Sequence, residues 1–495
     1  MRKTLSLAII FTVLSASFIL SDNNNNISLQ EFYGGYLSAN LWFYTDAFYG
    51  SRGDGLRMAG ATSTLDFHPS FSSYNPATLA YQYNAYAAMS LIPAAIPVSA
   101  FFGPQINNAI TSGENSALKN NLSNGAISVP SNLSQLNAGQ ASGITDFELV
   151  HPFAKDNIAI GVSREEKFNM DLNLLLSGAE ILATEANQSN PLFDLSLRGQ
   201  VNGMLDLEIK NIVTSVGIGR RITPEWGVGA VIEHIESSVN MNGNGIIDAM
   251  GTVAGNTEEF NTDSHNSLAQ QAAANLYSEA WGVRLGTSFH FLNDLLELAG
   301  DVAIEPDIKY NGVINVQGHF LPSTINLADF TATQTNTPDT SGQLSMKLPS
   351  YIRFTFAWRP SLALDINYIH YFDGYSMSFQ SPSLGNSNFP VMTSYNKLLR
   401  TNDYNVNLFM HDSIRLGFNF DKFQIGFGVI LAEAQTIMRN TNDDSTTGYD
   451  ESHVWVPIPL LSTGFDVQIM RYINTEVELA GLPFPYLKST ISFLF

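Results

Sequence analysis

The 495-residue chain contains no cysteine. Disulfide bonds, zinc-thiolate sites and thiol nucleophiles are therefore excluded, as is the lipid-modified cysteine of an exported lipoprotein. Basic residues are also scarce, because 24 Lys and Arg stand against 45 Asp and Glu, for a net charge of −21. This balance argues against a nucleic-acid partner, whose phosphates require Lys and Arg. The chain also lacks HExxH, GxSxG and P-loop motifs, so we expect no enzyme activity, no cofactor and no metal site.

Long apolar runs are missing after the first twenty residues. At the start of the chain, Arg2 and Lys3 precede an apolar stretch from Leu5 to Leu20, and an Asp/Asn tract follows. This order predicts a secretory signal peptide over residues 1–21, and a retained anchor helix is the alternative. Because no later stretch of about 18 apolar residues could form a spanning helix, any membrane residence must be as strands.

Alternation of apolar with small or polar residues recurs from about residue 157 to the end of the chain. Between Trp281 and Phe291 the odd-numbered residues are apolar or Thr, whereas Arg284 and His290 lie on the other face. The same pattern returns in three further segments, at 352–359, 414–420 and 423–429. An arginine cannot face hydrocarbon, so this pattern predicts strands with one face toward lipid and the other toward a wet lumen.

The spacing of turn residues predicts the strand number. Six short turns are expected near residues 156–157, 223–224, 293–294, 359–361, 421–422 and 471–472. Longer loops are expected near residues 93–143, 169–200, 241–277, 318–340, 380–400 and 438–452, with a short one at 483–485. These connections join about 14 strands, which predicts an all-β fold, a transmembrane antiparallel barrel over residues 82–495. A soluble β-sandwich or propeller remains the alternative.

The last strand ends in Phe495, as chains handled by the outer-membrane assembly machinery commonly do. We therefore expect this machinery and the lipid bilayer as partners, the outer membrane as location, and a monomer. Ahead of the barrel, residues 22–81 show little strand alternation and form a predicted extension and plug. A barrel of this size would otherwise leave an open aqueous bore.

Within this plug segment lies the tripeptide Asn75-Pro76-Ala77, directly before the first expected strand near Tyr83. Leu348-Pro349 leads into a strand from Tyr351 to Trp358, a short turn and another strand. In both features, and in strand number and plug position, the chain resembles the FadL family of outer-membrane transporters for long-chain fatty acids and other hydrophobic compounds. The family has an N-terminal hatch with an Asn-Pro-Ala motif, so the resemblance implies a hatch that includes Gly55, Arg57, Asn75, Pro76 and Ala77.

The resemblance implies a transport route. An apolar ligand is caught in an external groove, passes to an internal site under control of the hatch, and leaves sideways through the barrel wall. Such a route keeps a long acyl chain out of water, where it would lose roughly 0.8 kcal/mol per buried methylene. In the family the third strand bends inward to make the side opening, and Gly161 in the third expected strand would permit such a bend.

The predicted groove consists of two loop helices, and the alternative is that these helices only pack on each other and close the mouth of the barrel. Residues of one apolar face and of a second, packed helix would line it: Leu172, Leu175, Leu176, Ala179, Leu182, Leu268 and Leu276. A fatty-acid head group would require a cation, because an unpaired buried carboxylate is costly. The candidates are Arg57, Arg284, Arg353, Arg359 and Arg415, each of which could instead pair with a lumen carboxylate such as Asp365 or Glu233.

Three other functions remain open from sequence. A diffusion porin for polar solutes would need an open bore, a structural or adhesive barrel would bind partners through its loops, and a hydrolase would need a Ser/His pair. His234 and Glu236 share one strand face, which we interpret as a lumen salt bridge rather than a catalytic or metal pair. The ligand's identity is not encoded in any of these patterns.

Overall fold

The computed structural model describes most of the strand-forming chain. The described residues are 27–33, 36–50, 53–66, 70–95, 126–127, 144–153, 155–185, 195–253, 256–260, 268–319, 325–326, 331–332, 343–359, 363–380, 401–420, 422–441, 447–482 and 486–495. The predicted signal peptide, residues 1–21, lies outside them.

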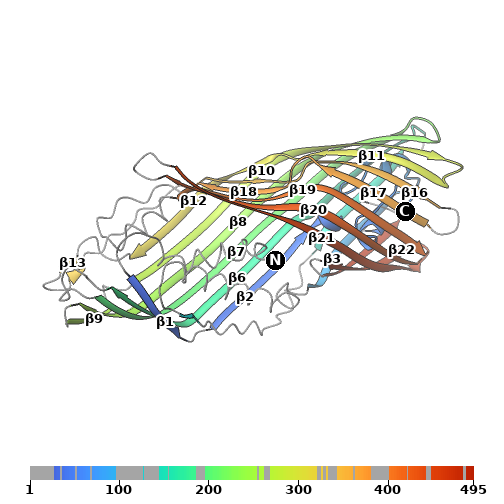
Figure 1. Ribbon diagram of the computed structural model, residues 1–495. Helices are drawn as coiled ribbons and strands as arrows, with labels where there is room; N and C mark the ends of the chain where they lie inside the picture. Colours follow the sequence, from blue (N-terminus) through green and yellow to red (C-terminus); the bar gives the residue numbers. More distant parts are fainter. Residues whose placement is uncertain are drawn as a thin grey trace.

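Fourteen strand positions form a closed antiparallel barrel, as the turn spacing predicts (Figure 1). In chain order they are β3 (Tyr86–Ala95), β5 (Ile144–Phe153), β6 (Ile158–Glu185), β7 (Leu195–Arg221), β8 (Trp226–Val253), β10 (Leu268–Phe291), β11 (Leu296–Ile304) with β12 (Asp307–His319), β15 (Gln343–Lys347) with β16 (Tyr351–Trp358), β17 (Ala363–Tyr371) with β18 (Tyr375–Gln380), β19 (Thr401–Phe420), β20 (Phe423–Thr441), β21 (Thr447–Met470), β22 (Ile473–Leu482) and β23 (Tyr486–Leu494). Each pairs with the next, and β23 pairs with β3 to close the ring.

The strand faces follow the predicted alternation. On β10, Trp281 is 66% exposed and Leu285 is 48% exposed, whereas Arg284 is only 2% exposed because it points inward. Outward apolar side chains recur around the barrel near its turn end, for example Phe354, Ile414 and Phe465. This belt is the feature expected of a barrel that crosses a membrane.

The six predicted short turns join consecutive strands at one end of the barrel. At the other end, three predicted loops are largely wrong. Residues 169–185 and 195–200 belong to β6 and β7, residues 241–253 and 268–277 belong to β8 and β10, and residues 438–441 and 447–452 belong to β20 and β21. A membrane span needs about 9–11 residues per strand. Since β6 has 28 residues and β10 has 24, these strands continue far beyond the apolar belt as an extended outer sheet.

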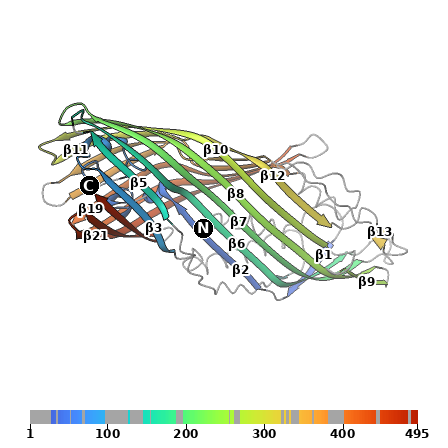
Figure 2. The same cartoon turned by 180° about the vertical axis from the view of Figure 1, so that it is seen from behind.

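The N-terminal extension also contains strands, contrary to the prediction for residues 22–81. β1 (Ile27–Tyr33) and β2 (Tyr36–Thr45) pair with the outer half of β6 (Figure 2). They do so because β5 is short and leaves that edge without a partner. The β5 ladder ends at Asp146↔Glu165, and the β2 ladder begins at Thr45↔Phe168.

Four further short strands lie at the outer end. β4 (Ala126–Ile127) pairs with β1, β9 (Asn256–Phe260) pairs with β8, and β13 (Ile325–Asn326) pairs with β14 (Thr331–Ala332) in a separate two-stranded sheet.

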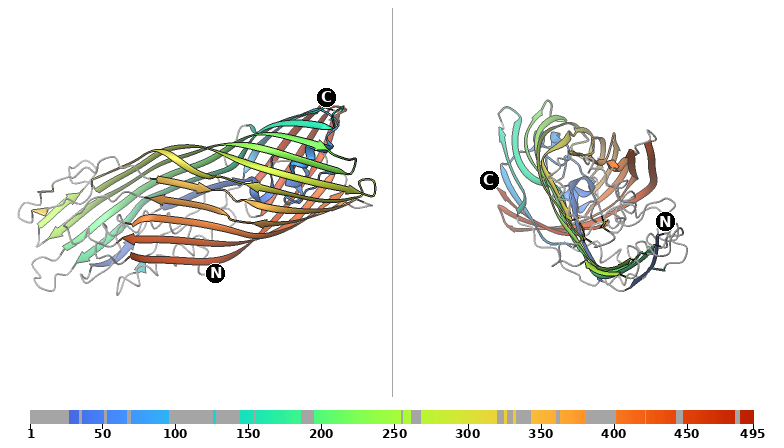
Figure 3. Two further views of the ribbon diagram at one scale, coloured as in Figure 1. Left: turned by 90° about the horizontal axis from the view of Figure 1, so that it is seen from above. Right: turned by 90° about the vertical axis from the view of Figure 1, so that its left-hand side faces the viewer.

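After β2 the chain turns into the barrel. Residues 46–82, which we call the internal segment, contain α2 (Asp46–Tyr49), α3 (Asp54–Arg57) and the 3-10 helix η2 (Pro76–Tyr81). Seen along the barrel, this blue segment lies between the surrounding strands (Figure 3). Its largest side chains, including Leu56, Met58 and Phe71, are fully buried against the wall. Within the part of the chain described above, no helix is both long enough and apolar enough to cross a bilayer.

Candidate functional site

The wall of the barrel is shaped to accept the internal segment. At nine inward-facing wall glycines, an added Cβ would come within 3.0 Å of a residue of this segment: Gly161, Gly217, Gly219, Gly227, Gly229, Gly286, Gly417, Gly426 and Gly464. For example, Gly229 faces the Pro76 carbonyl, and Gly426 faces the backbone of Met58. The absence of side chains at these positions lets the internal segment pack directly on the wall.

The Asn-Pro-Ala tripeptide is fixed to the wall through Asn75. The Asn75 side-chain oxygen accepts a hydrogen bond from Ala77 N at 2.9 Å and so caps η2. Its amide nitrogen donates to the carbonyl oxygens of Thr287 at 3.1 Å and Gly300 at 3.3 Å. A helix cap that also binds two wall strands explains why an asparagine stands here.

Ionic contacts hold the internal segment at the turn end of the barrel. Arg359 bridges Asp66 of the segment at 2.6 Å and Asp365 of β17 at 2.5 Å. The hydroxyl of Thr64 donates to Glu297 of β11 at 2.7 Å. Arg359 therefore contacts Asp365, one of the two lumen carboxylates named from the sequence as possible partners of the arginines, and links it to the internal segment.

Arg57 of the predicted hatch also forms an ion pair with a residue of the barrel wall. Its guanidinium lies 3.1 Å from Glu476, and both side chains are buried. Nearby, the Gly53 backbone N–H donates to Glu478 at 2.8 Å. These contacts tie α3 to β22 on the side of the barrel opposite Asn75.

Above the internal segment, four buried charges form a network. Lys167 Nζ donates to Glu233 at 2.7 Å and to Glu305 at 2.8 Å. Arg284 lies 2.9 Å from Glu233 and 3.4 Å from Glu305. Glu233 is the other lumen carboxylate named from the sequence as a possible partner of the arginines. The charges of two cations and two carboxylates cancel, which permits all four side chains to be buried.

This network predicts a large stability effect. Glu233→Ala leaves Lys167 and Arg284 with one carboxylate, and removal of one partner from a buried ion pair costs about 3–5 kcal/mol. The matched control is Glu236→Ala on the same strand, because the Glu236 contact with Arg164 is solvent-exposed and contributes about 1 kcal/mol or less. Thermal unfolding in detergent would measure both. Equal destabilisation by the two changes would contradict the importance of the buried network.

A cavity lies between this network, the internal segment and the wall. Its lining residues are Gly50, Ser73, Tyr74, Lys167, Arg284, Glu305, Leu348, Pro349, Tyr351, Arg353, Ile369, Tyr371, Tyr375 and Arg415. Three of the five predicted arginines are therefore brought together here, and Arg57 and Arg359 lie elsewhere. Four cationic side chains and four tyrosines surround the space, beside a single carboxylate.

The cavity arginines have protein partners in the structure. Arg353 makes a two-pronged contact with Asp301 at 2.8 and 2.9 Å. Arg415 donates to the Tyr371 hydroxyl at 2.9 Å and to Ser413 at 3.1 Å. These contacts orient the guanidinium groups toward the cavity, and contact with a ligand remains a prediction.

An apolar surface lines the inside of the outer sheet. Its buried members are Phe168, Leu172, Leu207, Ile209, Val213, Ile235, Val239, Ala274, Leu276, Ile308, Tyr310, Leu344, Met346 and Leu348, which we call the outer cluster. The predicted groove residues Leu172 and Leu276 both belong to it. Leu348 belongs to the outer cluster and to the cavity, so the two are continuous.

The two predicted groove helices are wrong. Leu172, Leu175, Leu176, Ala179 and Leu182 all lie in β6, and Leu268 and Leu276 lie in β10. As on any strand, neighbouring odd and even positions point to opposite faces: Leu172 is buried and Leu175 is 40% exposed. Along this stretch β6 pairs with β2 on one side and with β7 on the other, so its backbone N–H and C=O groups find hydrogen-bond partners as a strand.

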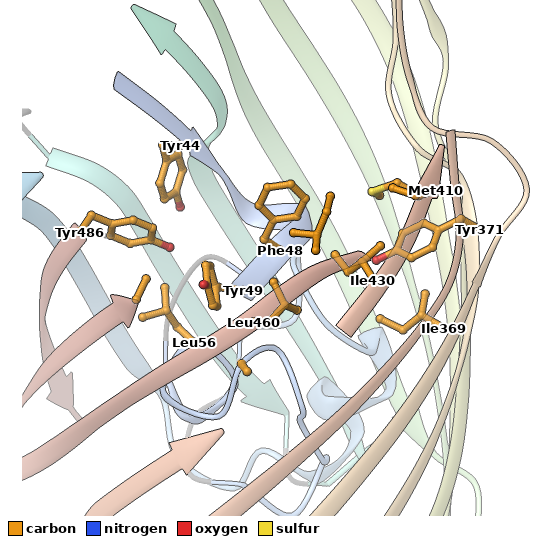
Figure 4. Close-up of a cluster of buried hydrophobic side chains, with 14 of the residues drawn as sticks. Tyr44, Phe48, Tyr49, Leu56, Ile369, Tyr371, Met410, Ile430, Leu460 and Tyr486 are labelled. Atoms are coloured by element: carbon orange, nitrogen blue, oxygen red, sulfur yellow. The ribbon is translucent and has the colours of Figure 1, made fainter. Parts of the chain in front are cut away.

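A second apolar cluster, shown in Figure 4, shares Ile369 and Tyr371 with the cavity lining. It joins Tyr44, Phe48, Tyr49 and Leu56 of the N-terminal part to wall residues such as Tyr371, Met410, Ile430, Leu460 and Tyr486, and we call it the inner cluster. Burial raises the pKa of the Tyr49 phenol well above its ordinary value, so this group stays neutral. Tyr375 packs against both clusters, and therefore links them beside the cavity.

Gly161 lies in an unbroken part of the wall. Its backbone pairs with Val150 on one side and Gly217 on the other. A Cβ at this position would overlap the ring of Phe71, so the glycine makes room for the internal segment. Its proposed role in a side opening stays a prediction.

His234 and Glu236 do not form the expected lumen salt bridge. The intervening Ile235 points inward, which places both polar side chains on the outer face. His234 lies 3.5 Å from Glu279, and Glu236 lies 3.1 Å from Arg164. Among the described residues, no group of three or more His, Asp and Glu side chains is arranged to hold a metal.

The sequence analysis missed Lys167, Glu305 and the tyrosines of the cavity. Lys167 stands in a run of four charged residues, 164–167, that breaks strict alternation on β6. This break was a usable signal. Glu305 directly precedes Pro306 at the end of β11. A charged residue beside a proline that ends a strand also departs from the alternating pattern.

No protein-family model matches the chain, and no curated protein matches its sequence. Solved structures do resemble it. The Ralstonia pickettii toluene transporter TbuX is 12% identical, covers 90% of this chain and 98% of its own, and gives a TM-score of 0.45. A Pseudomonas aeruginosa FadL homologue is 12% identical, with 90% and 96% covered and a TM-score of 0.44. The CymD monoaromatic hydrocarbon channel is 14% identical, with 90% and 97% covered and a TM-score of 0.41.

Proposed function

We propose that this chain is an outer-membrane transporter of the FadL type for hydrophobic small molecules. The observation that carries the proposal is a continuous series of buried apolar side chains inside the barrel. The outer cluster meets the cavity at Leu348 and Tyr375, and the inner cluster meets it at Ile369 and Tyr371. A water-filled porin has no need of such a lining, because polar solutes gain nothing from apolar walls.

The internal segment supports the gating part of the proposal. It fills the barrel below the cavity and is attached to the wall by Asn75, Arg57 and Asp66. We propose that it acts as the hatch, which blocks the aqueous route while the ligand moves along apolar surfaces. The apolar belt supports an outer-membrane location.

We further propose long-chain fatty acids as the ligand class. An acyl chain gains roughly 0.8 kcal/mol per methylene in contact with apolar surface. The cavity adds guanidinium hydrogen-bond donors for a carboxylate, from Arg284, Arg353 and Arg415. Monoaromatic hydrocarbons would also gain from contact with apolar surface, but they have no head group to accept hydrogen bonds from the arginines.

Binding to the purified protein tests this ligand class. Quenching of the protein's fluorescence would be titrated with palmitate and with its methyl ester, which has the same chain and no charge. We expect palmitate to bind more tightly, because the ester loses the charge-assisted contacts. Equal affinities for palmitate and its methyl ester would reject the head-group contact, and transport of apolar molecules would remain the proposed function. Absence of binding by both, and by toluene, would reject the proposed function and favour a structural or adhesive barrel.

A further inference from the structure

His290 lies where the internal segment meets the wall at the turn end of the barrel. It is the penultimate residue of β10 and is buried. The ring of Tyr81, the last residue of η2, stacks on the His290 ring with 3.9 Å between ring centroids and 15° between ring planes. His290 Nε2 lies 2.8 Å from the Thr64 hydroxyl oxygen, and Nδ1 lies 3.0 Å from Asp294 Oδ1. One wall side chain therefore contacts the internal segment at two separate places.

The hydrogen bonds around Thr64 decide which atom donates to which. The Thr64 hydroxyl has a single proton, which it donates to Glu297 at 2.7 Å, and the Ser288 hydroxyl donates to the same carboxylate at 2.7 Å. Thr64 Oγ1 therefore accepts from His290 Nε2. On the other side of the ring, the Asp294 carboxylate accepts from Nδ1. Both ring nitrogens carry a proton only in the imidazolium form, so His290 is positively charged in this arrangement.

The charge balance at the turn end agrees with a charged His290. Three carboxylates are buried here, those of Asp66, Glu297 and Asp365. Arg359 bridges Asp66 and Asp365. Glu297 accepts from hydroxyl groups, and one of these hydroxyls accepts in turn from His290. A buried carboxylate is costly without a cation nearby, so the imidazolium stabilises the attachment of the internal segment.

Proton loss from His290 breaks this arrangement. A neutral imidazole has one N–H, and the ionised Asp294 is a stronger acceptor than a hydroxyl oxygen, so the remaining proton stays on Nδ1. Thr64 then has a single proton for two acceptors, His290 Nε2 and Glu297. At the same time the ring loses the cation–π attraction to Tyr81. Both contacts with the internal segment are therefore weakened by one proton.

His290 is the group at this contact whose charge changes around neutral pH. The other titratable groups that face the contact come from η2, the neighbouring turns and strand ends: Tyr81, Arg221, Glu225, Asp294, Glu297 and Arg359. Carboxylic acids ordinarily titrate below this range and arginine far above it. Burial raises the pKa of the Tyr81 phenol above its ordinary value, so this group stays neutral. Histidine changes charge between about pH 5 and 8.

We propose that His290 is a pH-sensitive latch on the internal segment. The imidazolium holds Thr64 and Tyr81 against β10 in mildly acidic medium, and rising pH releases this end of the segment. For its effect on transport, the inference rests on the proposed role of the segment as the hatch. Asn75 attaches η2 to the wall through uncharged hydrogen bonds, so the segment stays in the bore when the latch is released.

Spin-label mobility tests the latch without any transport measurement. Because the chain has no cysteine, Gln82→Cys gives a unique labelling site directly after Tyr81. The labelled protein is placed in liposomes, checked for folding by heat-dependent gel mobility, and measured by electron paramagnetic resonance from about pH 5.5 to about pH 8.5. We expect the mobile fraction of the label to rise severalfold with pH, because Tyr81 leaves the His290 ring.

Two histidine variants of the labelled protein provide the comparison. His290→Gln removes the charge and should give the high mobile fraction at every pH. His234→Gln is the matched control, because this side chain lies on the outer face and pairs with Glu279, and it should keep the native pH dependence. A mobile fraction that stays constant with pH in the native chain would overturn the latch, as would a pH dependence that survives in His290→Gln.

Asp294→Asn decides the question if His290→Gln does not fold. Asp294 is mostly exposed, so its replacement is tolerated, and it removes a negative charge that favours the imidazolium. The pH at which the label becomes mobile should therefore fall, and an unchanged midpoint would contradict the latch.

Uptake of palmitate and toluene by the same proteins separates the latch from the proposed function. Absence of uptake together with a pH-dependent label that His290→Gln abolishes would reject the proposed function and keep the latch. Intact uptake with a label whose mobility ignores pH would reject the latch alone.

Discussion

Replacing residues 55–80 with a Gly/Ser linker of equal length is expected to turn a closed barrel into an ion-conducting channel. The replaced residues fill the bore with buried side chains such as Leu56, Phe71 and Leu79. Without them the nine wall glycines leave the lumen wider still. The linker keeps β2 and β3 in place, because its length is unchanged. Single-channel recording in a planar bilayer would show steady current in the variant and none in the intact protein.

A matched control replaces residues 325–332, which include the β13 and β14 hairpin, with a linker of the same kind. This change is outside the bore and should leave the barrel closed. If the 55–80 variant folds into the bilayer and still conducts no current, the internal segment is not the plug.

Gly229→Leu is expected to force η2 away from the barrel wall and so to admit ions. An added Cβ at this position would lie 2.2 Å from the Pro76 carbonyl oxygen, so the side chain and η2 cannot both keep their places. Overpacking of this kind costs about 1–3 kcal/mol, and backbone contact allows little relief. We expect a lower unfolding temperature together with intermittent ion current, since displaced η2 uncovers the bore.

The control for this substitution is Gly300→Leu on β11. Around Gly300 the nearest atom to an added Cβ is 3.5 Å away, so the same change is tolerated. Loss of stability without any current in Gly229→Leu would mean that the wall relaxes and the internal segment stays in place. That result would contradict the close coupling between wall and segment.

Much of the barrel could be predicted from local sequence. Two signals depend only on neighbouring residues: the alternation, such as that from Trp281 to Phe291, and the six turns. Together these signals predict the correct number of strands. The outer halves of β6 and β10 were harder to predict as strands from the sequence. Leu172, Leu175, Leu176 and Ala179 fit helical spacing, and it is the pairing of β6 with β2 and β7 that makes this stretch a strand.

The candidate site depends on contacts between distant residues. The arginines were correctly expected to point inward, and two of their partners, Asp365 and Glu233, were named. Which arginines share a cavity could not be predicted, because strand register and the path of the internal segment decide it. Pro306, Pro349 and Gly374 lie at interruptions of three neighbouring strands, and only the assembled sheet shows that these interruptions lie next to one another.

The central claim is that apolar molecules cross this barrel while polar solutes and ions do not. Its most direct test is uptake of labelled palmitate and labelled toluene by cells with and without the protein, beside uptake of a small sugar by the same cells. The account predicts that the protein increases uptake of at least one apolar probe and leaves sugar uptake unchanged. Increased sugar uptake with no change for either apolar probe would contradict it and identify the protein as a diffusion porin.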